Sequence, residues 1–523
     1  MKRRKILLVF PKSPISSYAD LRFCRIMARM PGGFMNVALP TVAALTPEEF
    51  EVTIVDENVE PVDFENSYDI VGITGFVTQF FRARQLASEF SRRGALVVCG
   101  GPSVSLSPER WRPFADVLII GEAEKVWSRF LTDYVNNHHA EEYRERERFD
   151  LSCSPIPDYT GFSRAARKRY TMGMVQASRG CPHSCEFCSV GPYVGRKMRY
   201  KPVDRVVQEV EQLKRLGFGI VLLADDNLTA DKGKAKALLR ALRDWNRAQR
   251  RPTMFVTQLS IDVARDEELL ELAAEAGMNS VQIGIESPSV ESLRETGKHQ
   301  NLASDMLADI KKFQEYGITV ISTCIVGFDH DGLSIFNDQL DFHGRSSVPN
   351  VQIFPLQAMD GTALKQRVVR EKRYVDWQAQ YGLHPERLYN LSSLTMIPKQ
   401  MSPRQLRAGT FWLLWKLYEP DAFLHRLSGF FANYDGSSKR RILNLPRYRL
   451  DAKRWGITLR LLKFLLTASR VERSCFRRTV KIARRSSHPQ ALGIATMAYL
   501  TLVNTRAFLL NRVPGIAAIP YPS

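Results

Sequence analysis

A chain of 523 residues is too long for one ordinary domain and predicts about three. Hydrophobic residues make up 44% of it and charged residues 25%, which excludes a disordered or low-complexity protein. The net charge of +19 is concentrated near the end, because residues 401–523 hold 22 Lys and Arg against 5 Asp and Glu and so contribute +17. A basic region of this kind suits anionic lipid or nucleic acid as a partner.

Residues 1–140 alternate apolar strands with helical segments. The strand candidates are 5–10, 51–57, 69–75, 95–101 and 116–122. Buried β-branched runs joined by helices predict a parallel, doubly wound (Rossmann-like) sheet. The first apolar run ends after five residues at Pro11, so we interpret it as a strand and not as a signal peptide. We therefore expect a cytoplasmic protein with reduced cysteines.

Glycine-rich turns follow three of these strands, at residues 72–75, 100–103 and 121–124. Ligands of doubly wound sheets bind at the carboxyl ends of the strands. Glycines there allow the backbone to approach a phosphate or a large flat cofactor. Tight turns between strand and helix need glycine equally, and the turns alone leave both interpretations open.

A second run of strand–helix units follows a polar segment, 141–170, that we interpret as a linker. Its strand candidates are 172–178, 218–225, 253–260, 279–287, 318–327 and 350–357. Six such units within residues 171–366 predict a partial (βα)6 barrel of the TIM type. The overall fold class is thus α/β, with a mainly helical, basic C-terminal domain at 367–523. The apolar stretch 491–503 has only thirteen residues, too few to span a membrane.

Three of the eight cysteines form the pattern C-x3-C-x2-C: Cys181, Cys185 and Cys188. A zinc site would need a fourth ligand, and His183, between the first two cysteines, is poorly placed to supply it. Disulfides do not suit an odd number of thiols in a reducing compartment. A 4Fe–4S cluster held by three thiolates keeps one iron open. The position just after the first barrel strand favours the cluster, because barrel active sites lie at strand ends. We expect the five scattered cysteines to be buried as small hydrophobes.

The cysteine motif, with Phe187 before its last cysteine, resembles that of the radical S-adenosylmethionine superfamily. The resemblance covers residues 170–360, roughly. It implies that S-adenosylmethionine chelates the open iron and is cleaved by an electron from the cluster to methionine and a 5′-deoxyadenosyl radical. It also implies a reducing partner of the flavodoxin or ferredoxin type.

The same resemblance implies that strand ends bind S-adenosylmethionine. The implied residues are Phe187, Asp225, Asp226, Gln258, Glu286, Ser287, Lys298, Val326 and Gly327. The alternative for each is an ordinary polar strand end. We favour that alternative for Lys298 and Gln258, and a binding function for Asp226 and Glu286.

A doubly wound domain before such a barrel resembles the cobalamin-binding subclass of this superfamily. The residues on the implied cofactor-facing loops are Pro11, Lys12, Thr74, Gly75, Phe76, Val77, Gly100, Gly101, Pro102, Ser103, Gly121 and Glu122. The chain departs from classical cobalamin domains because it has no Asp-x-His-x-x-Gly. Cobalamin is therefore inferred from the order of the domains.

The segments RGCPHSCEFCSV, 195–197 and IVGFDHDG (325–332) are similar to those of the branch that contains hopanoid C-2 methylase and bacteriochlorophyll-pathway enzymes. This resemblance implies a C-methyltransferase that acts on an unactivated carbon of a lipid or other secondary metabolite. Two alternatives stay open: a cobalamin-dependent radical cyclase or ring-rearranging enzyme, and an Fe–S electron-transfer or sensor protein.

The basic C-terminal region has amphipathic segments such as 456–468, with Arg and Lys between apolar residues. They predict either peripheral contact with the inner face of a membrane or an ordinary helical cap with a solvated basic face, the second being slightly favoured. We do not expect nucleic acid as a partner, since no appended RNA-binding domain or extra cluster motif is present.

Overall fold

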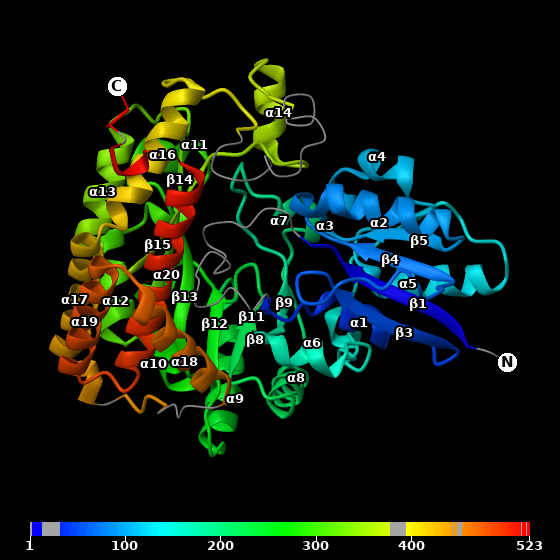
Figure 1. The fold of residues 1–523 in the computed structure, drawn as a ribbon, viewed down its shortest axis with the longest axis horizontal. Helices are drawn as coiled ribbons and strands as arrows, with labels where there is room; N and C mark the ends of the chain where they lie inside the picture. Colours follow the sequence, from blue (N-terminus) through cyan, green and yellow to red (C-terminus); the bar gives the residue numbers. More distant parts are fainter. Residues whose placement is uncertain are drawn as a thin grey trace.

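The computed structural model describes residues 3–12, 32–376, 394–441, 443–446, 452–513, 515–518 and 520–522. Within these residues the chain forms two large parallel sheets and a helical C-terminal region (Figure 1). The α/β class, the doubly wound N-terminal domain and the partial barrel predicted from the sequence are confirmed.

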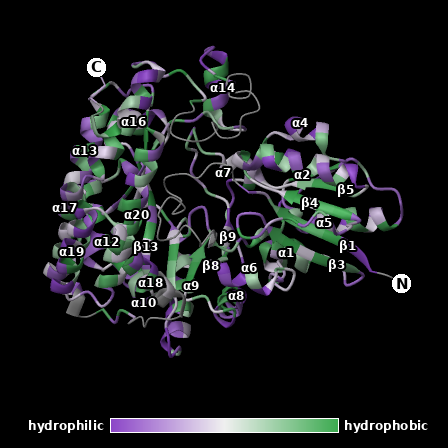
Figure 2. Cartoon of the chain, in the orientation of Figure 1, coloured by the Kyte–Doolittle hydropathy of each residue, from purple (hydrophilic) through white to green (hydrophobic). Residues whose placement is uncertain are grey.

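The N-terminal sheet has the strand order β3-β1-β4-β5-β6-β7, with all neighbours parallel. Its strands are β1 (Arg4–Phe10), β3 (Phe50–Asp56), β4 (Ile70–Thr74), β5 (Leu96–Gly100), β6 (Val117–Ile120) and β7 (Glu142–Arg144). The helices of this domain are α1 (Ala38–Ala44), α2 (Phe80–Arg92), α3 (Pro102–Leu106), α4 (Pro108–Trp111) and α5 (Ala123–Val135). Figure 2 shows β4, β5 and the inner part of β1 as mainly hydrophobic, as expected for strands buried on both faces of a sheet.

The second sheet has the order β15-β14-β13-β12-β11-β8-β2 and curls into an open half-barrel (Figure 1). Its strands are β2 (Gly32–Phe34), β8 (Tyr170–Val175), β11 (Ile220–Leu223), β12 (Met254–Gln258), β13 (Met278–Glu286), β14 (Thr319–Val326) and β15 (Asn350–Pro355). Two short antiparallel strands, β9 (Ser178–Arg179) and β10 (Arg199–Tyr200), follow β8.

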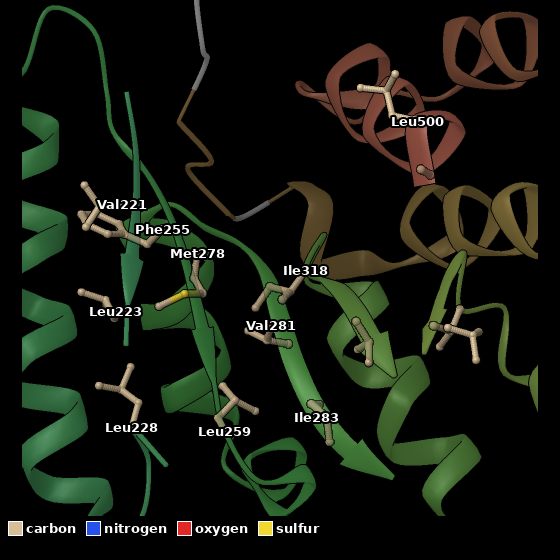
Figure 3. Packing of buried hydrophobic residues seen from close by; sticks show 14 of the residues in the cluster. Val221, Leu223, Leu228, Phe255, Leu259, Met278, Val281, Ile283, Ile318 and Leu500 are labelled. Atoms are coloured by element: carbon tan, nitrogen blue, oxygen red, sulfur yellow. The ribbon is translucent and has the colours of Figure 1, made fainter. Parts of the chain in front are cut away.

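Helices cover the outer, convex face of the half-barrel. They are α8 (Val203–Arg215), α9 (Lys232–Arg247), α10 (Glu267–Ala276), α12 (Met306–Glu315) and α13 (Ile335–Ser346). The short helices α7 (Val190–Val194) and α11 (Val290–Glu295) lie at the strand ends, and α6 (Arg164–Arg169) directly precedes β8. Along β13 the fully buried Val281 and Ile283 belong to the hydrophobic core (Figure 3), whereas Gln282 and Gly284, which alternate with them, are partly exposed. This alternation shows that side chains at every second position line the open, concave face.

Two segments lie elsewhere than the sequence indicated. Strand β2, in the range assigned to the first domain, pairs with β8 and so forms the edge of the half-barrel sheet. The predicted linker 141–170 carries β7, α6 and a bridge from Phe162 to Ile54. The Tyr159 hydroxyl also donates to the Met174 carbonyl at 3.4 Å, so this segment contacts both domains. Neither piece has a long periodic pattern, and only tertiary pairing makes them strands. The domain limits at 140, 170 and 366 stay a prediction.

The C-terminal region is helical, as predicted. Its helices are α14 (Ala363–Arg370), α16 (Pro403–Leu417), α17 (Pro420–Gly436), α18 (Ala452–Thr467), α19 (Arg470–Arg485) and α20 (Ala491–Arg512). Helix α20 extends beyond the apolar stretch 491–503, and Asn504 and Thr505, which continue it, are fully buried. In the part of the chain that the structure describes, residues 491–511 are long and apolar enough to cross a membrane by length and composition, but 61% of the apolar 18-residue window within them is buried inside the protein.

His488, between α19 and α20, fastens the C-terminal helices to the half-barrel. Its Nε2 donates to the carbonyl oxygen of Gly317 at 3.1 Å, and its Nδ1 accepts from the backbone of Gln490 at 3.1 Å. The bond to Nδ1 requires a neutral ring, because a protonated ring has no acceptor, and burial lowers the pKa of His488 to about 4. The unfolded chain therefore binds a proton here at a higher pH than the folded one, and this contribution to stability is lost as the pH falls from about 6.5.

We expect His488→Gln to show a reduced dependence of stability on pH. The stability advantage of the wild-type protein over the variant should shrink by up to about 1.4 kcal/mol per pH unit between about pH 6.5 and 5. Thermal midpoints at several pH values measure it, with His425→Gln on the exposed side of α17 as the control. A difference between wild type and His488→Gln that stays constant with pH would contradict the assignment.

Candidate functional site

The loop that carries the three cysteines begins directly after β9, at the carboxyl edge of the half-barrel sheet. All three thiols are free and partly exposed. Gly180, before the first cysteine, has φ +104°, and a Cβ there would lie 2.6 Å from the carbonyl oxygen of Lys197, so only glycine fits. The amide of Cys181 donates to the Gly195 carbonyl at 3.3 Å, and that of Glu186 donates to the Thr296 carbonyl at 3.0 Å. The backbone on both sides therefore fixes the loop.

The three cysteine side chains are not close enough together to bind one metal ion. Across the described residues, no three His, Cys, Asp or Glu side chains converge as the ligands of a single metal ion. A cubane cluster is larger than one ion and holds its thiolates farther apart. Burial raises the pKa of Cys188 to about 11 and also raises that of Cys181, while the charge of Lys298 acts in the opposite direction. A set of three free thiols beside a buried cation fits an anionic iron–sulfur cluster.

Asp225 and Asp226 follow β11 and differ in what they contact. The Asp225 carboxylate accepts from the hydroxyl of Ser178 at 2.5 Å and from the amides of Ser178 and Ala177, so it fastens β9 to the sheet. One Asp226 oxygen lies 3.3 Å from the amide of Gly180, against the cysteine loop. Burial raises the pKa of Asp225 to about 7 and that of Asp226 to about 6. Of the two, Asp225 is fully buried, whereas Asp226 is partly exposed.

Glu286 and Lys298 form a buried ion pair at the end of β13. The Lys298 ammonium lies 2.9 Å from Oε1 of Glu286, and the two side chains are 15% and 6% exposed. Glu286 has φ +62°, in the left-handed region, after a bulge in β13. A non-glycine residue held in that conformation is a frequent mark of a functional site. A Cβ on Gly284 would lie 2.2 Å from Oε1 of Glu286, so the glycine is what makes room for the pair.

We expect Glu286→Gln to weaken the use of S-adenosylmethionine more than it affects the cluster. The substitution leaves the buried Lys298 ammonium without its anionic partner. The ion pair then no longer holds the side chains of residues 286 and 298 in the positions that we expect S-adenosylmethionine to need. The KM for S-adenosylmethionine should rise at least about tenfold, on the order of 1.4 kcal/mol, while the iron content stays close to that of wild type. Glu291→Gln, an exposed residue of α11, is the control. An unchanged KM would contradict a role for Glu286.

The other residues implied by the resemblance gather at the same edge. The rings of Phe187 and Phe328 pack with their centroids 6.1 Å apart, which brings the cysteine loop against the end of β14. Gly327 there has φ +98°, and its amide donates to Asp331 at 2.8 Å. Val326 is buried, and Gln258 at the end of β12 is exposed. Ser287 is fully buried, and its hydroxyl accepts from the amide of Ser289 at 3.1 Å, a turn contact.

The glycine-rich loops of the N-terminal domain lie at the carboxyl edge of its sheet. Gly101 and Gly121 have φ +95° and +94°, and a Cβ at either would meet Thr74 or Glu145 of the same domain. Packing within the domain thus accounts for these two glycines. In contrast, the ring of Phe76, after β4, is 53% exposed. An exposed aromatic ring at this edge fits a large flat group such as a corrin.

The remaining residues of this predicted set also have contacts inside the domain. The carbonyl oxygen of Pro11 accepts from the side-chain amide of Gln79 at 2.7 Å, and the amide of Lys12 donates to Glu57 at 3.0 Å. The hydroxyl of Ser103 accepts from the indole of Trp111 at 3.2 Å. The residues Thr74, Gly75, Val77, Gly100 and Pro102 complete the edge, where β4 and β5 end.

Glu122 joins the two domains. Its carboxylate accepts from Arg199 at 2.7 Å and lies 3.3 Å from Arg179, while Arg179 also pairs with Glu124 at 2.6 Å. Burial alone would raise the pKa of Glu122, but the hydrogen bond from Arg199 and the charge of Arg179 bring it below its ordinary value. Arg179 stands two residues before Cys181. We call Arg179, Arg199, Glu122 and Glu124 the interdomain latch, since they tie the N-terminal domain to the base of the cysteine loop.

The structure also shows a charged cluster that the sequence did not suggest. Arg367 of α14 donates to both oxygens of Glu186, inside the cysteine motif, at 2.7 and 2.9 Å. It also bonds Asp329, after β14, and Glu295, at the end of α11, at 3.2 Å for the latter. The cysteine loop is therefore attached to the C-terminal region as well. No local signal marks these pairs, because their members lie far apart in the sequence.

The scattered cysteines only partly follow the prediction. Cys99, Cys324 and Cys475 are buried, but Cys153 is exposed, so the expectation for Cys153 is wrong. Cys24 lies outside the described residues.

These features together define a cobalamin-binding radical S-adenosylmethionine protein. The radical SAM superfamily model matches residues 175–342, and the B12 binding domain model matches residues 26–131. An uncharacterized methyltransferase of Synechocystis sp. is 30% identical over 465 residues, which cover 87% of this chain and 83% of the relative. The chain belongs to the cobalamin-dependent radical S-adenosylmethionine methyltransferases, whose cofactors are a 4Fe–4S cluster, S-adenosylmethionine and cobalamin.

Two further comparisons support this assignment. The hopanoid C-2 methylase of Rhodopseudomonas palustris is 29% identical over 383 residues, covering 71% of each chain. The structure is similar to that of OxsB, a cobalamin-dependent S-adenosylmethionine radical enzyme with aqua-cobalamin and S-adenosylmethionine bound. That match has a TM-score of 0.59 at 14% identity and covers 100% of this chain and 82% of the other. The structural likeness shows the shared fold.

Proposed function

We propose that this protein transfers a methyl group to an unactivated carbon of a hydrophobic substrate, a lipid or another secondary metabolite. The observation that carries the proposal is the interdomain latch. It ties a cobalamin-type domain to the residues directly before Cys181, so the two cofactor regions of this chain are attached to each other. A methyl donor and a radical source must face one substrate, and a fixed contact between their two domains provides this.

The proposed roles follow from the contacts. Cys181, Cys185 and Cys188 hold the cluster, and Gly180 allows their loop its shape. Glu286, Lys298 and Asp226 orient S-adenosylmethionine, and Phe187 with Gly327 borders its adenine. Asp225 and Ser287 support these residues from behind through their own hydrogen bonds. When bound, the cluster and cobalamin supply the electron and the methyl group, and the protein positions them and excludes water.

The concave face of the half-barrel supports a hydrophobic substrate. Met172, Met254, Val256, Ile321 and Phe354 are partly exposed at positions that alternate with fully buried outward residues. Apolar side chains on the open face of a sheet are a suitable lining for an apolar ligand. We propose a flavodoxin- or ferredoxin-type protein as the source of electrons, because the chain contains only one candidate cluster motif.

The test is anaerobic turnover of the reconstituted protein with S-adenosylmethionine, cobalamin, a reductant and a candidate lipid. We expect 5′-deoxyadenosine and S-adenosylhomocysteine to form together with a product heavier by one methylene. 5′-Deoxyadenosine without S-adenosylhomocysteine would favour the radical cyclase, and neither product would favour the electron-transfer or sensor protein. The absorption spectrum of protein produced with cobalamin available shows independently whether the N-terminal domain binds the corrin.

A further inference from the structure

Helix α18 carries an exposed apolar row, and helix α19, which follows it directly, carries an exposed basic row. The apolar members are Leu459, Leu462, Leu466 and Val471, which are 56%, 54%, 81% and 55% exposed. The basic members are Arg470, Arg477, Lys481 and Arg484, all exposed. We call these eight residues the α18–α19 surface. It belongs neither to the cofactor site nor to the interdomain latch.

Helical geometry places each set on one side of its helix. At 100° per residue, Leu459, Leu462 and Leu466 lie within about 60° of one another. Leu461 and Phe464, between them, turn inward and are 5% and 8% exposed. The outward leucines are thus extra to the packing of α18. An exposed apolar row of this kind is a mark of an interaction surface.

The cations of α19 form a second row. Their spacings of seven, four and three residues place them within about 60° of one another around the helix. The helix has seven Arg and Lys and one Glu. Within the described part of the chain, none of the four row members forms an ion pair, in contrast with Arg478, which pairs with Asp421. The row therefore presents positive charge without an ion pair, on the helix that directly follows the exposed leucines.

We propose that the α18–α19 surface docks on a leaflet that contains anionic phospholipids. The leucines enter the boundary between headgroups and acyl chains, and the arginines and lysine bind the phosphates. This inference deepens the proposed function and rests on it, since an apolar substrate would be drawn from the bilayer. Helix α19 lies on the side of the half-barrel away from the N-terminal domain, and α18 lies at the lower part of the half-barrel in this view (Figure 1), so docking leaves the interdomain latch in place.

Sedimentation with phospholipid vesicles tests the proposal on the full chain. We expect at least tenfold more binding to vesicles of phosphatidylcholine with about one-third phosphatidylglycerol than to phosphatidylcholine alone, falling as salt rises. The variant Leu459→Ser/Leu462→Ser/Leu466→Ser should bind at least tenfold less. Val290→Ser/Val369→Ser/Ile397→Ser, three exposed apolar residues elsewhere, should bind as wild type does. Equal binding by the two triple variants, or no binding by wild type, overturns the proposal.

A polyanion separates lipid from nucleic acid as the partner. The variant Arg470→Gln/Arg477→Gln/Lys481→Gln/Arg484→Gln should lose binding to both anionic vesicles and heparin. The leucine variant should lose the vesicles only. The charge control is Arg84→Gln/Lys168→Gln/Arg250→Gln/Lys312→Gln, at exposed sites on other elements. The lipid assignment would be overturned if the leucine variant bound vesicles as the wild type does while the charge variant lost binding to both vesicles and heparin. That outcome would show general polyanion binding.

Docking and catalysis are measured separately. Cleavage of S-adenosylmethionine without substrate should proceed at the wild-type rate in the leucine variant, which also shows that the variant is folded. Methylation of a lipid presented in vesicles should fall with binding. Vesicle binding without any methyl transfer would leave docking correct and the proposed function wrong. If both triple variants transferred methyl groups at an equal rate and neither bound vesicles, the proposed function would be correct and the docking proposal wrong.

Discussion

Cys185→Ala should yield a protein without a stable 4Fe–4S cluster and without detectable 5′-deoxyadenosine. The reason is chemical, since a cubane that already leaves one iron open has only three thiolates and loses a third of its protein ligands. The loop backbone around Cys185 has its own bonds, from Cys188 to the Cys185 carbonyl and from Glu186 to Thr296, so the fold should persist. Iron and sulfide content, the electron paramagnetic resonance of the reduced protein and product analysis measure the effect.

Cys153→Ala is the matched control, because Cys153 is a free, exposed thiol outside the motif. It should retain cluster and cleavage at wild-type levels. If Cys185→Ala kept its cluster and its cleavage activity, the three-cysteine assignment would be wrong. If Cys153→Ala lost them equally, the loss would reflect general thiol damage and not ligation.

The parts of the fold that the sequence predicted are those with strong local patterns. Apolar runs such as 5–10 and 318–327 became β1 and β14 with shifts of a residue or so, because buried parallel strands need continuous hydrophobic residues. The spacing of Cys181, Cys185 and Cys188 likewise identified the loop without any long-range information. Short pieces such as β2 and β7 have no such pattern, and only their neighbours make them strands.

The interactions that assemble the site were hidden for a related reason. Arg179 stands within the quoted motif, but its partners Glu122 and Glu124 lie more than fifty residues away. The position of Glu122 on a glycine-rich loop predicts that it faces the cofactor. The structure places this loop at the end of β6, as expected, but the Glu122 side chain contacts Arg179 and Arg199 of the other domain. Charged residues reveal their partners only in three dimensions, since any of the 55 acidic residues could pair with a given arginine.

Arg179→Met should separate cleavage from methyl transfer. Arg179 is 13% exposed and is the partner of Glu124, itself 3% exposed, so its removal leaves a carboxylate buried without its cation. Loss of one member of a buried pair costs about 3 kcal/mol. Much of that cost can be relieved by opening the contact between the domains, which lets water reach Glu124. The three cysteines and their loop contacts are retained, so we expect the cluster and cleavage of S-adenosylmethionine to persist.

The predicted signature is a ratio. Methylated product per 5′-deoxyadenosine should fall at least about tenfold in Arg179→Met, because the methyl donor no longer sits at a fixed distance from the radical. Arg179→Lys keeps the charge but cannot contact Glu122 and Glu124 through two separate nitrogens. Its ratio of methylated product to 5′-deoxyadenosine should lie between that of Arg179→Met and that of the wild type. Arg129→Met is the control, an arginine of α5 that stacks on Tyr143 away from the domain contact. If product and 5′-deoxyadenosine fell by the same factor, Arg179 would act on the cluster itself, and the latch would not be what couples the two domains.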